Sequence, residues 1–197
     1  MPRPSRLPEK RRELLPIVAR AFAELGYRRA TTAELARRCG VQENVLYRLW
    51  PDKKAMFIAA IRYVYDLSVD IWLRLVGRPN EAGTAAERLL AYESTHHGEF
   101  GHYRIVFAGL SETDDPEVRA ALADMYRRFQ RFLREQIATH RELSGRATGL
   151  DPALAAWAVV GLGTVSNIAR ELGLVSDTQR RRLFTEVGRT LLDGDPA

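Results

Sequence analysis

The chain has 197 residues, of which 46% are hydrophobic and 28% are charged, as in a folded globular protein with a sizeable core. Its single cysteine, Cys39, excludes an intrachain disulfide framework and every zinc site built from several cysteines. The N-terminal residues are charged and lack an apolar run with a cleavage site, so we expect no secretory signal and a cytoplasmic protein.

Positive charge is concentrated in the first third of the chain. Residues 1–60 contain 13 Lys and Arg against 6 Asp and Glu, whereas residues 61–197 contain 17 against 19. Each cation placed at a phosphate releases condensed counterions, so a basic segment of this kind favours nucleic-acid binding. The alternative is a solvated basic face that serves only solubility.

The hydrophobic pattern predicts an all-α fold. Apolar residues recur at three- and four-residue spacing, and no stretch shows the period-2 alternation of a strand. In chain order, the expected helices are 13–25, 32–39, 43–49, 52–76, 84–97, 100–110, 116–141, 152–173 and 177–192. Residue types that favour helix starts support these ranges, namely Thr31 with Glu34, Asp52, Asp115, Asp151, and Ser176 with Gln179.

Pro16 affects where the first helix begins. A proline inside a helix removes a backbone donor and clashes with the carbonyl four residues earlier, so the sequence favours a start near Arg12. Residues 1–11 then form a basic N-terminal arm. Cations in the arm are candidates for contacts with phosphates or the minor groove, and they are Arg3, Arg6, Lys10 and Arg11.

Residues 31–50 have the pattern of a helix-turn-helix. Such a unit needs a small residue where two short helices touch, a glycine where φ is positive, and apolar residues toward the core. Ala36 and Gly40 meet the first two needs. We interpret Cys39 as a small buried hydrophobe, with a redox switch as the alternative. The expected core residues are Leu35, Cys39, Val41, Leu46 and Leu49.

With its flanks, this segment resembles the DNA-binding domain of the TetR family of bacterial repressors. The resemblance rests on Leu14-Leu15, Ala21-Phe22, Gly26-Tyr27, Thr31-Thr32, Leu35-Ala36, Gly40-Val41, Leu46-Tyr47 and Trp50-Pro51-Asp52-Lys53. Three positions depart from the family pattern. Pro16 lies within the usual first helix, Gln42 replaces a common serine, and Trp50 replaces the usual phenylalanine.

The resemblance implies roles for individual residues. In the family, the second helix of the unit enters the major groove, so the candidates for reading base edges are Gln42, Glu43, Asn44 and Arg48. Residues at phosphate-binding positions are Thr31, Thr32, Tyr47 and Lys53. Other roles remain open for three of these candidates. Thr31 is alternatively only a helix cap, Tyr47 is alternatively part of the core, and Glu43 alternatively acts by rejecting wrong DNA sequences.

The same resemblance divides the chain into an arm at 1–11, a DNA-binding domain at 12–51 and an effector-binding and dimerisation domain at 52–197. Residues 152–169 carry no charge, but alanines, glycines and polar residues dilute them, so we expect a buried helix and no membrane span. The last helix is expected to place Leu183, Phe184, Val187 and Leu191 on one side and Arg180, Arg181, Glu186 and Arg189 on the other. In the family, the pair 152–173 and 177–192 forms a homodimer interface.

Aromatic residues are frequent in the middle helices, where core packing is the simplest interpretation. The resemblance implies an effector cavity there, and Tyr92, His96 and Tyr103 are its candidate polar groups. The full candidate set is Trp72, Tyr92, His96, Phe100, Tyr103, Phe107, Met125, Phe129 and Trp157. A metal site formed by Glu93, His96, His97 and His102 is an alternative, although we expect neither a metal nor a cofactor.

The sequence therefore predicts a DNA-binding repressor that a small, largely apolar effector releases from a palindromic operator. Two alternatives remain, a DNA-binding protein without an effector and a helical enzyme with an unrecognised site. No Gly-rich phosphate loop, Ser/His/Asp motif or paired-carboxylate motif supports the enzyme.

Overall fold

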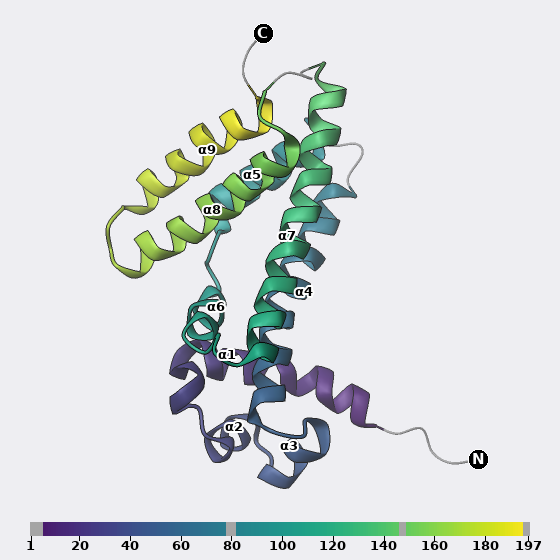
Figure 1. Cartoon of the computed structure of the whole chain (residues 1–197), viewed down its shortest axis with the longest axis vertical. Helices are drawn as coiled ribbons and strands as arrows, with labels where there is room; N and C mark the ends of the chain where they lie inside the picture. The colour runs from purple at the N-terminus through teal and green to yellow at the C-terminus, as the bar shows by residue number, and fades with distance from the viewer. Residues whose placement is uncertain (1–5, 78–81, 146–148, 195–197) are drawn as a thin grey trace, which may run out of the picture. The chain divides into compact units, whose positions relative to one another are not determined.

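The computed structural model describes residues 6–77, 82–145 and 149–194, and these ranges contain nine α-helices and no strand (Figure 1). The all-α prediction is confirmed. The helices are α1 Leu7–Arg29, α2 Thr32–Cys39, α3 Glu43–Leu49, α4 Lys53–Val76, α5 Ala85–His96, α6 Tyr103–Leu110, α7 Pro116–Leu143, α8 Pro152–Glu171 and α9 Asp177–Asp193. From α2 to α9, every helix begins and ends within three residues of its predicted range.

The first helix differs most from its prediction. It begins at Leu7, so the predicted start near Arg12 is wrong, and Pro16 lies inside the helix on an exposed position. A second proline occupies the first turn, where a missing N–H costs nothing. Gly26 interrupts the helix near its end with φ 72° and ψ 169°. Of the expected arm, residues 1–5, including Arg3, lie outside the described residues.

Side-chain caps explain most of the helix starts. Asp52 Oδ1 accepts from the Ala55 N–H, and Asp115 and Asp151 accept from the first turns of α7 and α8 in the same way. Reciprocal capping boxes form at Ser176 with Gln179, as predicted, and at Thr84 with Glu87, which the sequence analysis missed. Thr31 accepts from the Glu34 N–H, but the Glu34 carboxylate bonds Arg37 and Arg38 and does not return to Thr31.

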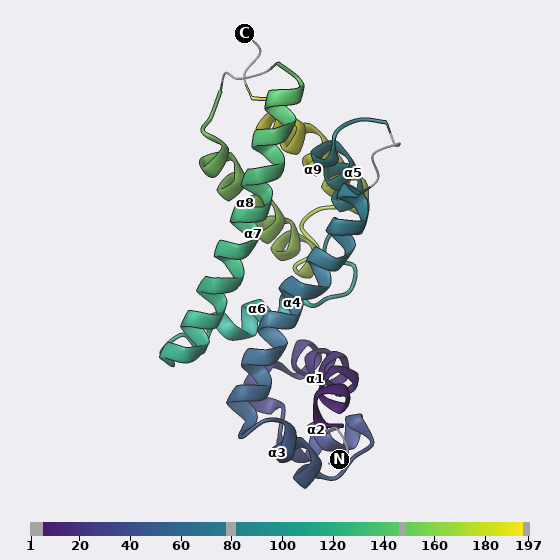
Figure 2. The ribbon, with the colours of Figure 1, turned by 90° about the vertical axis from the view of Figure 1, so that its right-hand side faces the viewer.

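The chain forms two compact units. Unit 1 comprises residues 1–67 and 100–125, and unit 2 comprises residues 68–99 and 126–197. These limits differ from the expected boundary at residues 51 and 52, because α4 and α7 each contribute residues to both units. In unit 1, α1 packs against α2, α3 and α6 (Figure 2).

Aromatic residues form much of the core of unit 1, in which α1 packs against α4. The Phe22 and Phe57 rings meet edge to face at 5.0 Å between centroids, and the Tyr27 ring lies 4.8 Å from Phe57. Trp50 is 1% exposed at the end of α3, with the Arg11 guanidinium 5.4 Å from its ring centroid. A large buried aromatic residue therefore joins the end of α3 to the core.

In unit 2, α9 packs against α5 and α8, and α8 runs beside it in Figure 1. The closest approach is at Gly188, where a Cβ atom would lie 2.5 Å from Cδ1 of Leu90. Any larger residue at this position would require the Leu90 side chain to move. Buried residues at the centre of this unit are Ala86, Ile137, Ala155, Ala156 and Leu192.

Two buried polar residues of α7 hold the end of α9. Arg141 donates from Nε to the Leu192 carbonyl at 3.1 Å and from Nη2 to the Leu191 carbonyl at 3.0 Å. His140 Nε2 lies 3.0 Å from Asp193 Oδ1, and its Nδ1 lies 2.8 Å from Thr84 Oγ1. The Arg141 contacts satisfy carbonyls that the helix end leaves without intrahelical partners, and His140 contacts the side chain of the last residue of α9.

Helix α8 is buried on one side only. Small residues, Ala155, Ala156 and Gly163 among them, lie on the buried side. The other side exposes a row of large apolar residues in the single chain, namely Leu154, Trp157, Val165, Ile168 and Leu172. Among the described helices, α8 alone is long and apolar enough to cross a membrane. Core helices of soluble proteins often have the same length and composition.

Candidate nucleic-acid interface

The helix-turn-helix forms at the predicted residues. Helix α2 ends at Gly40, whose φ of 63° and ψ of 31° allow the turn, and α3 begins after Gln42. Leu35 and Leu46 are fully buried between the two helices and the rest of unit 1. Burial raises the pKa of the Cys39 thiol, which disfavours the reactive thiolate and agrees with Cys39 as a small hydrophobe.

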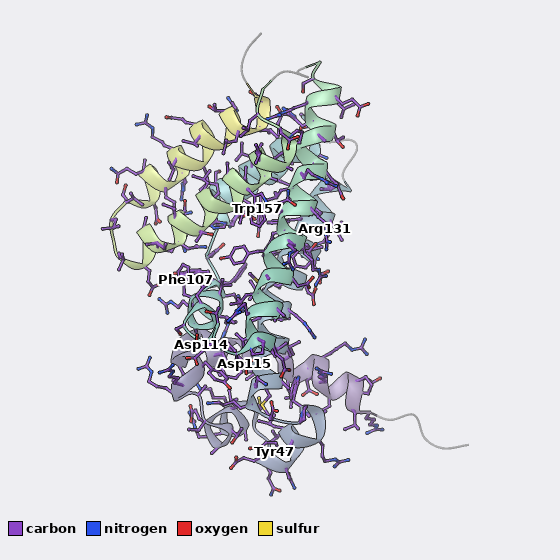
Figure 3. The ribbon with its side chains drawn as sticks, in the orientation of Figure 1. Tyr47, Phe107, Asp114, Asp115, Arg131 and Trp157 are labelled. Atoms are coloured by element: carbon purple, nitrogen blue, oxygen red, sulfur yellow. The ribbon has the colours of Figure 1, made fainter. Side chains whose placement is uncertain are left out.

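The start of α3 presents a polar surface to solvent. All four candidate base readers are exposed, and they are Gln42, Glu43, Asn44 and Arg48. Tyr47 is 47% exposed, and its hydroxyl donates to Thr32 Oγ1 at 3.2 Å. It projects from the lower edge of α3 in Figure 3. Leu46 is the buried residue of α3, so one side of this helix faces the core and the other is open to solvent.

Two candidate phosphate contacts also have structural roles. Thr31 caps α2 through Oγ1 at 3.2 Å from the Glu34 nitrogen. Lys53 donates to the Tyr27 carbonyl at 3.1 Å, and its Nζ lies 4.4 Å from the Tyr27 ring centroid. The Lys53 ammonium is therefore fixed at the start of α4 before any DNA is present.

A groove between the start of α1 and α3 carries three cations that the sequence did not bring together. Arg6 and Lys10 approach Arg48, and the groove is completed by Leu7, Val45 and Leu49. Because α1 begins at Leu7, Lys10 lies on a helix and not in an extended arm. The three cations therefore lie beside the exposed polar side of α3, and Lys10 also pairs with Glu13 at 2.9 Å.

Arg37 and Arg38 are held by an acidic partner on the same helix. Both donate to the Glu34 carboxylate, which lowers the pKa of Glu34 to about 2. Arg38 also contacts Glu24 on α1. The Arg38–Glu24 pair thus adds a polar contact between α2 and α1 to their apolar packing.

Ion pairs connect the DNA-binding segment to the start of α7. Arg28 Nε donates to Glu112 at 2.8 Å, and Lys54 Nζ lies 3.2 Å from Asp115 and 2.5 Å from Glu117. Asp115 lies at the α6–α7 connection near α1 (Figure 3). The partners are 61 or more residues apart in the sequence, so local patterns gave no signal for these pairs.

The candidate effector residues belong to both units. Unit 1 contains Phe100, Tyr103, Phe107 and Met125, and unit 2 contains Trp72, Tyr92, His96, Phe129 and Trp157. In unit 2, the Trp72 ring lies 5.4 Å from Phe129 and 5.2 Å from Phe132. Phe100 and Trp157 are 60% and 46% exposed, and Trp157 projects from α8 in Figure 3.

A polar network lies beside the Trp72 cluster. Trp72 Nε1 donates to Glu93 at 2.7 Å, and the second Glu93 oxygen lies 2.7 Å from His97 Nδ1. His97 Nε2 lies 3.0 Å from the Gly163 carbonyl and 3.1 Å from Asn167 Nδ2. A Cβ on Gly163 would lie 3.0 Å from the His97 ring, so the glycine makes room for the imidazole.

The metal alternative finds no support in the described part of the chain, where no three His, Cys, Asp or Glu side chains gather in a way that could hold a metal ion. His96 pairs with Glu99 at 2.8 Å, and His97 pairs with Glu93. His102 belongs to unit 1, where its ring meets Tyr63 edge to face.

His102 should make the stability of the protein depend on pH. Its pKa is lowered from 6.5, first because burial disfavours the charged ring and second because of the charge of Arg20. Near pH 6.5 the unfolded chain therefore binds more protons than the folded chain, so the free energy of unfolding falls as the pH drops through this range. We expect urea unfolding to show the loss beginning below about pH 7.5 and continuing until the pH falls through the lowered pKa of folded His102. His102→Gln should flatten this dependence, whereas the control His96→Gln should retain it.

Residues 19–60 match the family model described as bacterial regulatory proteins, tetR family. Two curated bacterial proteins are similar over longer stretches. The HTH-type transcriptional regulator YuxN of Bacillus subtilis is 24% identical over 55% of this chain and 38% of its own length. The nucleoid occlusion factor SlmA of Escherichia coli is 28% identical over 74% of this chain and 75% of its own length.

The fold is shared with solved structures. A transcriptional regulator from Saccharomonospora viridis, solved in complex with choline, superposes with a TM-score of 0.74 at 20% identity. The superposition covers 92% of this chain and 96% of that one. Similarity therefore extends beyond the helix-turn-helix to the helices that follow it.

Proposed function

The chain belongs to the TetR family of DNA-binding transcriptional regulators, and from that premise we propose that it is a cytoplasmic, homodimeric repressor that a small molecule releases from a palindromic operator. The observation that carries the proposal is that α3 exposes polar side chains while its apolar side packs into the core. A groove lined by Arg6, Lys10 and Arg48 lies next to it. The family consists of regulators, and we propose no enzymatic activity.

In this proposal, base recognition and backbone contact are made by different residues. Gln42, Glu43 and Asn44 occupy the first turn of α3, from which a recognition helix reaches base edges in the major groove. Arg48, one turn later, stands beside Arg6 and Lys10, so it contacts either the last base of a half-site or its phosphates. Thr31, Thr32, Tyr47 and Lys53 fix the position of α3 on the backbone.

The dimer is formed by α8 and α9 of two copies. The row of exposed apolar residues on α8 is larger than the scattered apolar residues of an ordinary surface, and a second copy would cover it. A two-fold pair of α3 helices then addresses two half-sites of a palindrome.

The small molecule binds among the aromatic residues of the regulatory helices. Support comes from the Trp72, Phe129 and Phe132 cluster and from the choline bound in the related Saccharomonospora viridis structure. The second candidate function, DNA binding without an effector, is favoured by the similarity to SlmA, whose name describes a nucleoid occlusion factor. Dependence of operator binding on a ligand distinguishes the two.

A pair of substitutions tests the division of labour at the DNA. We expect Asn44→Ala to weaken operator binding by about 1–3 kcal/mol, mainly at one base position, and Lys53→Gln to weaken binding to all sequences and reduce the salt slope by about one. Competition binding against operators altered at single positions provides the measurement. Since Asn44 is exposed, its variant should unfold like the parent, while Lys53→Gln also loses the Tyr27 contacts. Equal losses on operator and random DNA for Asn44→Ala would show that this residue does not read bases.

A further inference from the structure

Unsatisfied buried polar atoms are concentrated on α8 and the start of α9. Among the described residues, seven covered side-chain N and O atoms have no hydrogen-bond partner, and five of them belong to this region. They are Ser166 Oγ, Asn167 Oδ1, Arg170 Nε, and Nε and Nη1 of Arg180. We call these four residues the α8–α9 polar cluster. Because buried polar groups are nearly always paired, such a concentration needs an explanation.

Arg180 is the central member of the cluster. The sequence places it on the polar side of the last helix, yet its side chain is 4% exposed. Its described contact is between Nη2 and Asp177 Oδ1 at 3.3 Å, and Asp177 is itself 78% exposed. Burial removes the water that would hydrate the Arg180 guanidinium, and the exposed Asp177 carboxylate at 3.3 Å replaces it only in part. A buried charge with so little compensation is unfavourable.

Asn167 and the turn of α9 that follows Arg180 both lie next to His97. Arg180 lies one turn before Phe184, whose ring centroid is 4.9 Å from that of His97. Asn167 contacts His97 directly, and Ser166 and Arg170 are separated by one turn on the same side of α8. Helices α8 and α9 pack against each other, so these side chains share one region of unit 2.

The half-buried carboxylate of Glu93, beside His97, is already engaged. Glu93 accepts from Trp72 Nε1 with one oxygen and lies 2.7 Å from His97 Nδ1 with the other. It therefore does not neutralise Arg180. The unpaired atoms are mainly donors, three guanidinium N–H groups and one hydroxyl, and their natural complement is an acceptor-rich anion.

We propose that the α8–α9 polar cluster is the recognition site for an anionic group of the effector, with Arg180 as its main contact. The proposal rests on the ligand-responsive function above and specifies the ligand class, an acid with an apolar chain or ring. The apolar part fits the aromatic side chains beside the cluster, Phe184 and the group around Trp72. In the ligand-free protein, neighbouring side chains cover the cluster, and the bound anion takes their place.

Calorimetric titration of the DNA-free protein tests the site. The probes are octanoate, octyl phosphate, 1-octanol and octylammonium, with inorganic phosphate as an anion that lacks a tail. We expect octanoate or octyl phosphate to bind more tightly than the neutral and cationic analogues, and the stronger of the two identifies the acid. Arg180→Met should weaken that binding about tenfold or more. Arg182→Met is the matched control, because Arg182 is on the same helix but its side chain is 72% exposed.

The apo protein provides an independent readout. If Arg180 is an unpaired buried charge, Arg180→Met should leave the midpoint of urea unfolding unchanged or raise it, whereas a structural salt bridge would make the variant less stable. Should Arg180→Met fail to fold, Arg180→Lys keeps the charge but loses the planar donors, and the same drop in affinity is expected.

Three outcomes would overturn the proposal: no binding of either anion at millimolar concentration, affinities of both octanoate and octyl phosphate that do not exceed that of 1-octanol, or unchanged anion affinity in the folded Arg180 variants. Failure of the repressor function gives a different result. In that case an anion binds through Arg180, but operator affinity is the same with and without it.

Discussion

Gly161→Trp is expected to make the protein monomeric at micromolar concentration. Gly161 lies on the exposed side of α8 with Leu154, Val165 and Leu172, and apart from its chain neighbours and the adjacent backbone of α8, no described atom lies within 4 Å of a Cβ built there. An indole at this position therefore does not disturb the single chain, but it blocks close approach of a second α8. Sedimentation velocity measures the change in mass.

Loss of the dimer should also weaken operator binding. A monomer engages one half-site and loses the gain from linking two binding modules, so operator affinity should fall by about 10² to 10⁴-fold. Gly161→Ala is the matched control, since a methyl group fits a close helix contact and should preserve both mass and operator affinity. A dimeric Gly161→Trp protein with parental operator affinity would show that α8 does not form the interface.

Effector and operator should each weaken the binding of the other by the same factor. A ligand shifts an equilibrium only through its different affinities for the two states, so it must bind better when the two α3 helices are held at a spacing unsuited to the operator. Coupling of about 1–3 kcal/mol corresponds to a change of roughly 5- to 150-fold. Helix α4 is the expected connection, because it is continuous through residues of both units.

The measurement compares ligand affinity with and without saturating operator. Intrinsic fluorescence can report binding through Trp72, whose indole donates to Glu93, and through Trp157, while Trp50 contributes background. Random DNA at the same concentration is the control for nonspecific electrostatic effects. Identical ligand affinities under all three conditions would eliminate the mechanism, even for a ligand that binds tightly.

Short-range patterns predicted the fold well. Helix spacing, the Asp52 and Ser176 caps and Gly40 act over a few residues, so the sequence alone contains what is needed to place them. The start of α1 was wrong because the penalty for a proline inside a helix was taken as decisive. Burial of Leu14 and Val18 on either side of Pro16 provides the compensation, and this is a tertiary effect.

Polar contacts between residues far apart in the chain could not be predicted from the sequence. The exposed residues of α3 were predicted from a local motif, whereas the meeting of Arg6 with Arg48 depends on how α1 packs. Arg180 was placed on the wrong side of α9, because a charged residue is ordinarily assigned to solvent. One signal was present, since Asn167 interrupts a nearly apolar helix, and polar residues in such surroundings usually have partners such as His97.

Pro16 has a consequence for how this protein can be altered. Without its N–H, the Arg12 carbonyl lacks the usual helical partner, so the turns that begin at Leu7 are tied less firmly to the rest of α1. Segments of this kind open at a lower free energy than the whole domain. Arg6 and Lys10 are carried by this segment, and the base-reading residues are not. If the proposed contacts hold, substitutions in the first two turns of α1 should change the overall affinity for DNA and leave the choice of operator, which we assign to α3, the same.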